Sequence, residues 1–183
     1  MRPFSSSDSF SPPVADSSSP ERIAVIPAGV DTLVAYLQWQ LLPNQDRTAE
    51  WFDWQTYPLT EFFGGMELCR DKLGPGRHKF VDVGSGIGTK LFLADSLGFE
   101  PTGIERREDY IEVSRRLYPE YKVHHANALD FTAYEQFDVI YTYRLARNEQ
   151  LQEQVHNHIL QNMRDEAILF ASDTPATLDK IPT

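Results

Sequence analysis

The segment that most constrains this chain is Phe80–Thr89, which reads FVDVGSGIGT. An apolar run containing one acid, Asp82, leads into three glycines, one at every second position. A short apolar run bounded by such a turn is typical of a buried strand. Glycine lets the backbone turn sharply and lie against a ligand with no Cβ in between. The segment therefore predicts a strand, a tight turn and a helix around a nucleotide-type cofactor.

The spacing of the glycines separates two kinds of cofactor. The dinucleotide fingerprint G-x-G-x-x-G places its third glycine three residues after the second. Here Thr89 occupies that position and the third glycine comes one residue early, at Gly88. The carboxylate of Asp82, two residues before the first glycine, suits a cationic or amine-bearing ligand better than a pyrophosphate. A nicotinamide-dependent oxidoreductase is therefore disfavoured.

The form D-x-G-x-G-x-G resembles the first motif of the class I S-adenosylmethionine-dependent methyltransferases, and the resemblance extends over residues 79–172. It implies an α/β fold that is Rossmann-like and doubly wound, with a mostly parallel sheet and helices on both faces. It also implies S-adenosylmethionine as cofactor, with Asp82 helping to hold its amino group. The loop residues that would lie along the methionine part of the cofactor are Gly84, Ser85, Gly86 and Gly88.

Two later segments follow in the order that this family requires. A second strand over 101–105 ends in Glu105, whose carboxylate can accept hydrogen bonds from both ribose hydroxyls, as an acid at this separation does in dinucleotide folds. A third strand over 121–125 precedes Asn127 and Ala128, where many family members carry Gly-Asp-Ala. Asn127 replaces the Asp that meets the adenine amino group. Its amide can still accept from that amine and donate to a ring nitrogen.

A fourth strand, predicted over 136–143, borders the methyl group in this family. Methyl transfer is an SN2 displacement at a sulfonium, so the enzyme must align nucleophile, methyl and sulfur. Tyr141 and Tyr143 are the candidate catalytic or substrate-positioning residues, and we expect only one of them to face the cofactor. The alternative is a structural role, because aromatic residues suit pleated surfaces. The strand lacks the Asn/Asp-Pro-Pro-Tyr sequence of methyltransferases that act on DNA base amines.

No metal site is predicted. His156 and His158 are two residues apart on a predicted helix, so they do not share the face that an i, i+4 metal pair needs. The single cysteine, Cys69, leaves no intramolecular disulfide and no thiolate zinc cage. We expect it to be buried on a helix, in a protein of the reducing cytoplasm.

The net charge of −10 disfavours a nucleic-acid substrate, because affinity for such polyanions comes largely from phosphate neutralisation. The best candidate for a local basic patch is formed by Arg106, Arg107, Arg115 and Arg116. Acids are interleaved with these arginines, so the interpretation that we favour is a solvated helix face. No run of eighteen apolar residues indicates a membrane span, and no secretory signal is visible.

The chain divides by composition into three parts. Residues 1–22 are a Ser/Pro tail for which we expect disorder. Residues 23–76 are aromatic-rich and are predicted to form a helical cap, in which Trp54 and Tyr57 are the aromatics best suited to a cation–π contact with a sulfonium. Residues 77–183 are predicted to be the cofactor-binding core.

Helices are predicted over 59–73, 90–97, 110–117 and 148–162, with a fifth strand over 166–172. Only eleven residues follow this strand, too few for the antiparallel sixth and seventh strands that usually finish the sheet in this family. We therefore expect a truncated sheet whose edge is covered by the N-terminal region or completed by a second subunit in a homodimer.

Two functions follow from these features. The first is an S-adenosylmethionine-dependent methyltransferase that acts on a small molecule or a protein. The second is a non-catalytic member of the fold that serves as a binding or interaction module. The missing strands and Asn127 favour the second function. The intact glycine loop and its acid favour the first, because a scaffold without a ligand has no need of three glycines there.

Overall fold

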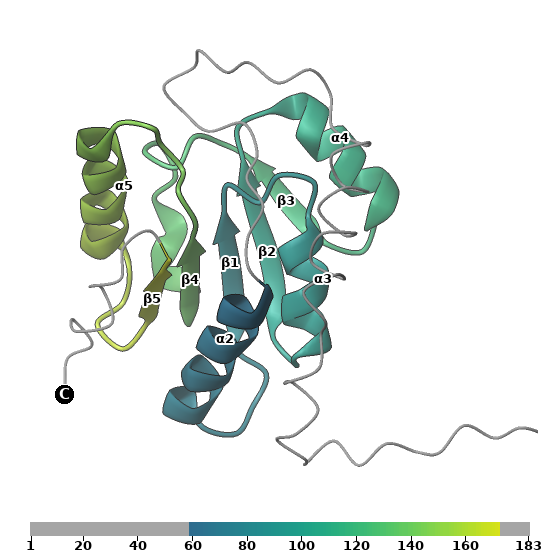
Figure 1. Cartoon of the computed structure of the whole chain (residues 1–183), viewed down its shortest axis with the longest axis vertical. Helices are drawn as coiled ribbons and strands as arrows, with labels where there is room; N and C mark the ends of the chain where they lie inside the picture. Colours follow the sequence, from purple (N-terminus) through teal and green to yellow (C-terminus); the bar gives the residue numbers. More distant parts are fainter. Residues whose placement is uncertain (1–58, 173–183) are drawn as a thin grey trace, which may run out of the picture.

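The computed structural model describes residues 59–172, in which five parallel strands form one sheet with helices on both faces (Figure 1). The spatial order is β3-β2-β1-β4-β5. The strands are β1 (Lys79–Val83), β2 (Glu100–Glu105), β3 (Lys122–His125), β4 (Val139–Thr142) and β5 (Ile168–Ala171). Because the order reverses between β1 and β4, their carboxyl ends border the crevice where open α/β sheets bind ligands. The predicted Rossmann-like α/β fold is confirmed.

Four helices and one 3-10 turn connect or precede the strands. They are α2 (Leu59–Leu73), α3 (Thr89–Ser96), α4 (Glu108–Leu117), η2 (Ala133–Gln136) and α5 (Glu149–Asn162). Helix α2 has the predicted bounds, and the other helices begin within two residues of theirs. Strand β4 is shorter than predicted, because the chain over 133–136 turns as a 3-10 helix before the strand begins.

Strand β1 lies at the centre of the sheet. Every residue of β1 after Lys79 is buried, as expected for a parallel strand covered on both faces. It pairs with β2 and β4, and in this register Asp82 lies beside Gly103 on one side and Tyr141 on the other. The acid of the glycine motif is thus held in the middle of the sheet.

One face of the sheet packs against α2 and α3. Its core contains Phe62 and Met66 from α2, Leu91 from α3, and Phe80 and Tyr141 from the strands, all at most 1% exposed. Phe62 meets Tyr141 edge to face, with ring centroids 5.3 Å apart. A Cβ on Gly65 of α2 would overlap the Phe170 ring of β5, so this helix lies directly on the sheet. The aromatic residue Phe62 of the predicted cap is therefore a core residue.

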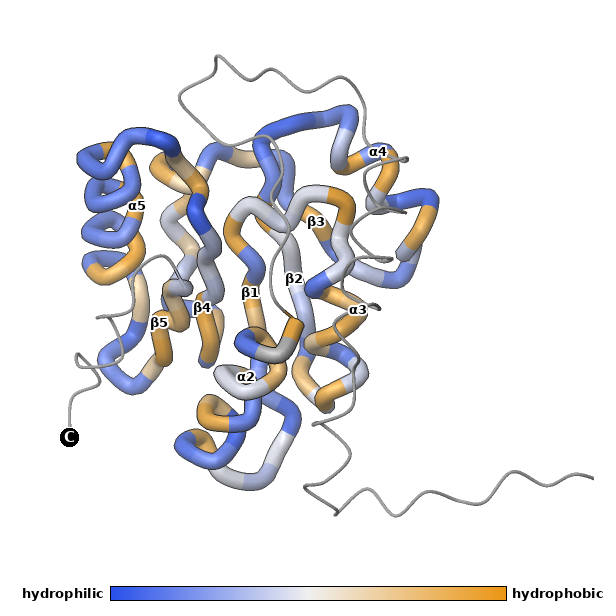
Figure 2. Tube along the Cα trace, viewed as in Figure 1, coloured by the Kyte–Doolittle hydropathy of each residue, from blue (hydrophilic) through white to orange (hydrophobic). Residues whose placement is uncertain are grey.

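The opposite face packs against α5. Val81, Ile140, Val155 and Ile159 are fully buried there. Figure 2 shows the apolar positions along the strands and on the sheet-facing side of α5. The two cores explain why the central strands are apolar on both faces.

Cys69 is buried on α2, as predicted. Burial raises the pKa of its thiol to about 12. This thiol therefore stays protonated and inert near neutral pH.

Among residues 59–172 the sheet ends at β5, which pairs with β4 alone. The tail over 1–22, Trp54 and Tyr57 lie outside the described residues, and so does the segment after Ser172. Within the described part of the chain, no helix is both long enough and apolar enough to cross a bilayer.

Candidate functional site

The glycine loop turns directly after β1 and is tied to the end of β2. Gly84, Gly86 and Gly88 have φ values of 77°, 54° and 88°, in the left-handed region that residues with a Cβ avoid. The amides of Gly84 and Ser85 both donate to the carbonyl of Ile104, at 2.8 and 3.0 Å. The three glycines are thus a requirement of the backbone, as the sequence predicted.

Neighbouring side chains also leave no room for a Cβ in the loop. A Cβ on Gly84 would overlap Leu145, which follows β4, and one on Gly88 would lie 2.5 Å from Ser114 Oγ of α4. Ser85 is buried, and its hydroxyl occupies the space left by Gly103 of β2, where a Cβ would lie 2.5 Å from Ser85 Oγ. The loop is therefore packed from three neighbouring elements.

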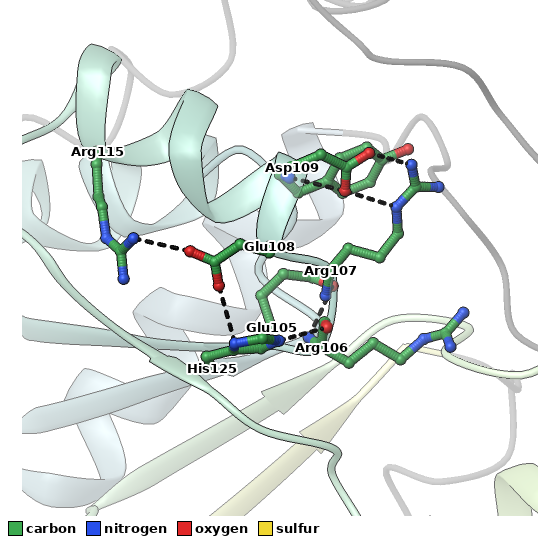
Figure 3. A network of polar contacts seen from close by, with 8 residues as sticks. Glu105, Arg106, Arg107, Glu108, Asp109, Arg115 and His125 are labelled. Carbon is green, nitrogen blue, oxygen red and sulfur yellow. Dashed lines mark hydrogen bonds and ion pairs between the residues drawn. The ribbon is translucent and has the colours of Figure 1, made fainter.

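Glu105, the last residue of β2, holds the loop through its carboxylate (Figure 3). Oε2 accepts from the amide of Gly86 at 2.9 Å, and Oε1 accepts from the amides of Arg106 and Arg107, each at 2.9 Å. Burial raises the pKa of this carboxyl, and the three backbone hydrogen bonds oppose that rise. A carboxylate has about four acceptor sites, so Glu105 can accept from a ligand hydroxyl as well.

Two of the four arginines of the candidate basic patch, Arg107 and Arg115, are paired with acids (Figure 3). Arg107 makes a two-pronged ion pair with Asp109, and its guanidinium lies 4.2 Å from the centroid of the Tyr110 ring. The hydrogen bond from Arg107 lowers the pKa of Asp109. Glu108, the first residue of α4, accepts from Arg115 of the same helix at 3.1 Å. The interpretation as a solvated helix face, instead of a basic patch, is therefore supported.

Asp82 is the most unusual ionisable group of the site. It is 1% exposed, and within residues 59–172 no hydrogen-bond donor reaches its Oδ2. Burial raises the pKa of this carboxyl to about 6; the charge of Lys90 opposes the rise and that of Glu105 adds to it. A buried polar atom without a partner is costly, so this oxygen is suited to a donor supplied by a ligand.

Asn127 and Ala128 follow β3 and lie at the same edge of the sheet as Glu105. The amide of Ala126 donates to the Glu105 carbonyl at 3.0 Å, which attaches this segment to the end of β2. Asn127 Oδ1 accepts from the Leu129 amide at 3.1 Å in a local turn. Ala128 is buried, and its carbonyl accepts from the Tyr134 hydroxyl at 2.9 Å. The segment is thus held beside the predicted ribose-binding acid.

Tyr141 and Tyr143 lie on the same face of the sheet. Lys90 Nζ is 5.4 Å from the centroid of the Tyr141 ring and 6.0 Å from that of Tyr143. The two residues do not alternate, because residues two apart in a strand share a face, and which of them meets a cofactor stays a prediction. Tyr141 is fully buried among Phe62, Phe80 and Phe170, whereas Tyr143 is only partly buried. Tyr143 is therefore the better candidate to meet a substrate.

The sequence interpretation assigned no role to four residues at or near the end of β4. Thr142 is fully buried, and its Oγ1 lies 3.1 Å from His156 Nε2 of α5. Gln152 of the same helix accepts from the Ala146 amide at 3.0 Å. Arg144, two residues after Thr142 in the chain, has a φ of 38°. Only tertiary packing brings these residues together, so the chain order carries no signal of the network. Among residues 59–172, no cluster of His, Cys, Asp and Glu is suited to a metal ion.

No protein-family model and no curated protein matches the chain. Solved structures do resemble it. Streptomyces venezuelae DesVI has 17% identity and a TM-score of 0.53, with 80% of this chain and 59% of DesVI covered. CalS10, a SAM-bound amino pentose methyltransferase from Micromonospora echinaspora, has 16% identity and a TM-score of 0.53, with 62% of this chain and 50% of CalS10 covered.

The plantazolicin methyltransferase BpumL, solved with SAH and a pentazolic desmethylPZN analog, has 19% identity and a TM-score of 0.52, with 69% of this chain and 53% of BpumL covered. The chain thus spans about half to three-fifths of the length of these structures. Strand order, the glycine loop and these neighbours agree on the architecture. The chain has the fold of the class I S-adenosylmethionine-dependent methyltransferases.

Proposed function

We propose that this chain binds S-adenosylmethionine and transfers its methyl group to a small-molecule or protein acceptor. One observation carries the proposal: among residues 59–172, no donor reaches a buried carboxylate oxygen of Asp82, which lies beside a glycine loop fixed by Glu105. The solved methyltransferases with this fold include one bound to SAM and one bound to SAH. One of them is an amino pentose methyltransferase and the other was solved with a desmethylPZN analog, which supports a small-molecule acceptor for this chain as well.

The residues of the site fit this cofactor. Asp82 would accept from the methionine ammonium, which supplies the missing donor. Glu105 would accept from the ribose hydroxyls through its remaining acceptor capacity. Asn127 and Ala128, attached to the end of β2, would border the adenine. The cradle along the methionine part would be formed by Gly84, Ser85, Gly86 and Gly88, whose glycines have positive φ.

Bound S-adenosylmethionine supplies an electrophilic methyl group on a sulfonium. The protein's contribution is to hold the reacting groups in line and to exclude water, since alignment supplies much of the acceleration. The end of β4 lies beside the end of β1, and Tyr143, which follows β4, would orient an acceptor there. The Thr142–His156 contact fixes this strand end against α5.

The alternative is a non-catalytic binding module. It is supported by the sheet edge at β5 and by the partial coverage of the neighbouring structures. It does not account for the buried Asp82 oxygen without a donor, which is costly unless a ligand satisfies it. We therefore favour the enzyme.

Calorimetry with S-adenosylmethionine and S-adenosylhomocysteine tests the proposal. We expect saturable binding of both, abolished by Gly86→Arg, which places a large side chain at a φ of 54° in the loop. Glu108→Gln is the control variant and should bind both ligands, since Glu108 is a half-exposed acid outside the glycine loop. Absence of binding to the wild-type chain would overturn the proposal. Binding without methyl transfer to any acceptor in a labelled-methyl screen would favour the binding module.

A further inference from the structure

Two side chains of α5 hold the chain on either side of Tyr143. His156 and Gln152 are four residues apart on this helix, so they share one of its faces. His156 Nε2 lies 3.1 Å from Oγ1 of Thr142, the residue before Tyr143. Gln152 Oε1 accepts from the amide of Ala146, three residues after Tyr143, at 3.0 Å. Both ends of the short segment between these contacts are thus attached to the same helix.

This segment, residues 143–145, has a backbone that needs support. Within the described part of the chain, Arg144 is the only residue other than glycine with a positive φ, at 38°. A residue with a Cβ is strained there, and such strain persists where the surrounding structure fixes the backbone. Leu145 packs on the glycine loop, since a Cβ on Gly84 would lie 2.4 Å from Leu145 Cδ2. Tyr143 is therefore carried by a strained segment that contacts the candidate site.

The amide of Gln152 determines which nitrogen of His156 carries the proton. A backbone amide only donates, so the atom of Gln152 that faces Ala146 is its oxygen, and its nitrogen faces His156. That nitrogen lies 2.8 Å from His156 Nε2, and an NH2 group only donates. His156 Nε2 therefore accepts, and the ring carries its proton on Nδ1. The Thr142 hydroxyl, whose hydrogen rotates, donates to the same nitrogen.

We infer that His156 is a positioning residue: as a neutral imidazole protonated on Nδ1, it orders Gln152 and Thr142, and through them it holds segment 143–145 in place. The inference rests on the proposed function in making Tyr143 the residue that meets the acceptor. A proton on Nε2 would set one donor against another. Turning the Gln152 amide over would relieve that conflict only by setting its nitrogen against the Ala146 amide.

NMR of the imidazole nitrogens in the ligand-free protein tests the protonation state. Long-range proton–nitrogen correlation at neutral pH should show His156 with a proton on Nδ1 and none on Nε2. His158, on the same helix, is the internal control, because its Nε2 lies 2.8 Å from the Phe131 carbonyl and should carry the proton. A proton on Nε2 of His156, in a neutral or a charged ring, would overturn the inference.

Hydrogen exchange at the Ala146 amide tests the attachment of the segment. His156→Gln keeps an acceptor on this face of α5 and should preserve the protection of that amide. His156→Lys offers only donors and should accelerate its exchange by roughly twofold to tenfold, the range of one neutral hydrogen bond. Equal exchange in the two variants would overturn the inference. His158→Gln is the matched control and should leave the exchange unchanged. Circular dichroism melting verifies folding, and the wild-type spectrum decides if His156→Lys does not fold.

Calorimetry with S-adenosylhomocysteine tests the link to the candidate site. Because Leu145 packs on Gly84, His156→Lys should bind this ligand more weakly by a similar factor, and His156→Gln should bind it as wild type does. Faster exchange in His156→Lys with unchanged affinity would overturn the positioning role, since the segment would then move without affecting the loop. If the wild-type chain does not bind S-adenosylhomocysteine, the proposed function fails, whereas the spectrum and the exchange rates still support or overturn the role of His156 in the segment.

Discussion

The amide of Gly86 donates to Oε2 of Glu105 at 2.9 Å, across nineteen positions of the chain. This bond joins the glycine loop after β1 to the last residue of β2. The same carboxylate also accepts from the two amides that follow it. Glu105 therefore serves the site twice: it shapes the loop, and its remaining acceptor capacity is available to a ribose.

Glu105→Gln should weaken S-adenosylhomocysteine binding by roughly tenfold to a hundredfold, because hydrogen bonds to a charged group contribute about 1.5–3 kcal/mol. A Gln has one acceptor oxygen and cannot take all three amides. Calorimetry measures the loss, and Glu108→Gln should change the affinity less than twofold because its partners lie on the surface. Equal affinities for Glu105→Gln and wild type would contradict the assigned role.

Gly88→Ala should be more destabilising than Gly98→Ala. The two residues have nearly the same φ, 88° and 89°, so both variants incur the left-handed strain of about 1–2 kcal/mol. Only Gly88 is crowded, with Ser114 Oγ 2.5 Å from the added Cβ, whereas no atom lies within 4 Å at Gly98. Urea unfolding gives the difference, which reports the crowding alone. In a Ser114→Ala background, the difference in stability between the two variants should be smaller. If it is unchanged, the loop relieves the crowding by moving elsewhere.

The ligand-free protein should lose stability as pH rises from about 4 to 6. The pKa of Asp82 is about 6 in the folded chain against 3.8 when unfolded, so in this window the folded state holds more protons. The contribution is fully present below the unfolded pKa and disappears as pH rises through the folded pKa, with a size of the order of 2 kcal/mol. The raised pKa of Glu105 acts in the same direction.

Asp82→Asn isolates this contribution because it cannot titrate. Urea unfolding at several pH values should show its stability increasing relative to wild type as pH rises through this window. Parallel curves for the two proteins would show that Asp82 has an ordinary pKa. The affinity of the wild-type protein for its ligand should instead increase as pH rises through this window, since the ionised carboxylate is the form that binds an ammonium.

Phe62→Ala should destabilise the protein by about 3–5 kcal/mol, the usual effect of emptying a buried aromatic position. Phe62 is fully buried against Phe80 and Tyr141, so its loss opens a cavity under β1 and β4. Leu68→Ala on the same helix is the control, because Leu68 is 60% exposed and its removal should change stability by less than about 1 kcal/mol. Equal effects would show that α2 contributes little to the core.

What the sequence could predict here is what local chemistry dictates. The glycines were recognisable because the turn requires positive φ, and Glu105 because an acid ends a short strand at the right separation. Helix α2 was predicted end to end because Pro58 precedes it and Gly74 follows it. The roles assigned to Asp82, Asn127 and Tyr143 stay predictions until ligand binding is measured.

The rest depends on contacts between distant segments. The contact of Lys90 with the Tyr141 ring joins α3 to β4, so residue spacing along the chain could not reveal it. The Thr142–His156 contact crosses from a strand to the next helix, so spacing alone could not reveal it. The assumption that Tyr141 and Tyr143 point to opposite faces was wrong, because the side-chain period of a strand is two residues and keeps both on one face.

Four amides of the glycine loop are already occupied. Gly84 and Ser85 donate to Ile104, Gly86 donates to Glu105, and Gly88 donates to the Ser85 carbonyl. These four groups cannot solvate an incoming anion, in contrast to the open amides of a phosphate-binding loop. At these four positions the loop therefore offers a ligand its shape and not its polarity, and sulfate or pyrophosphate should compete poorly for the site even at high concentration.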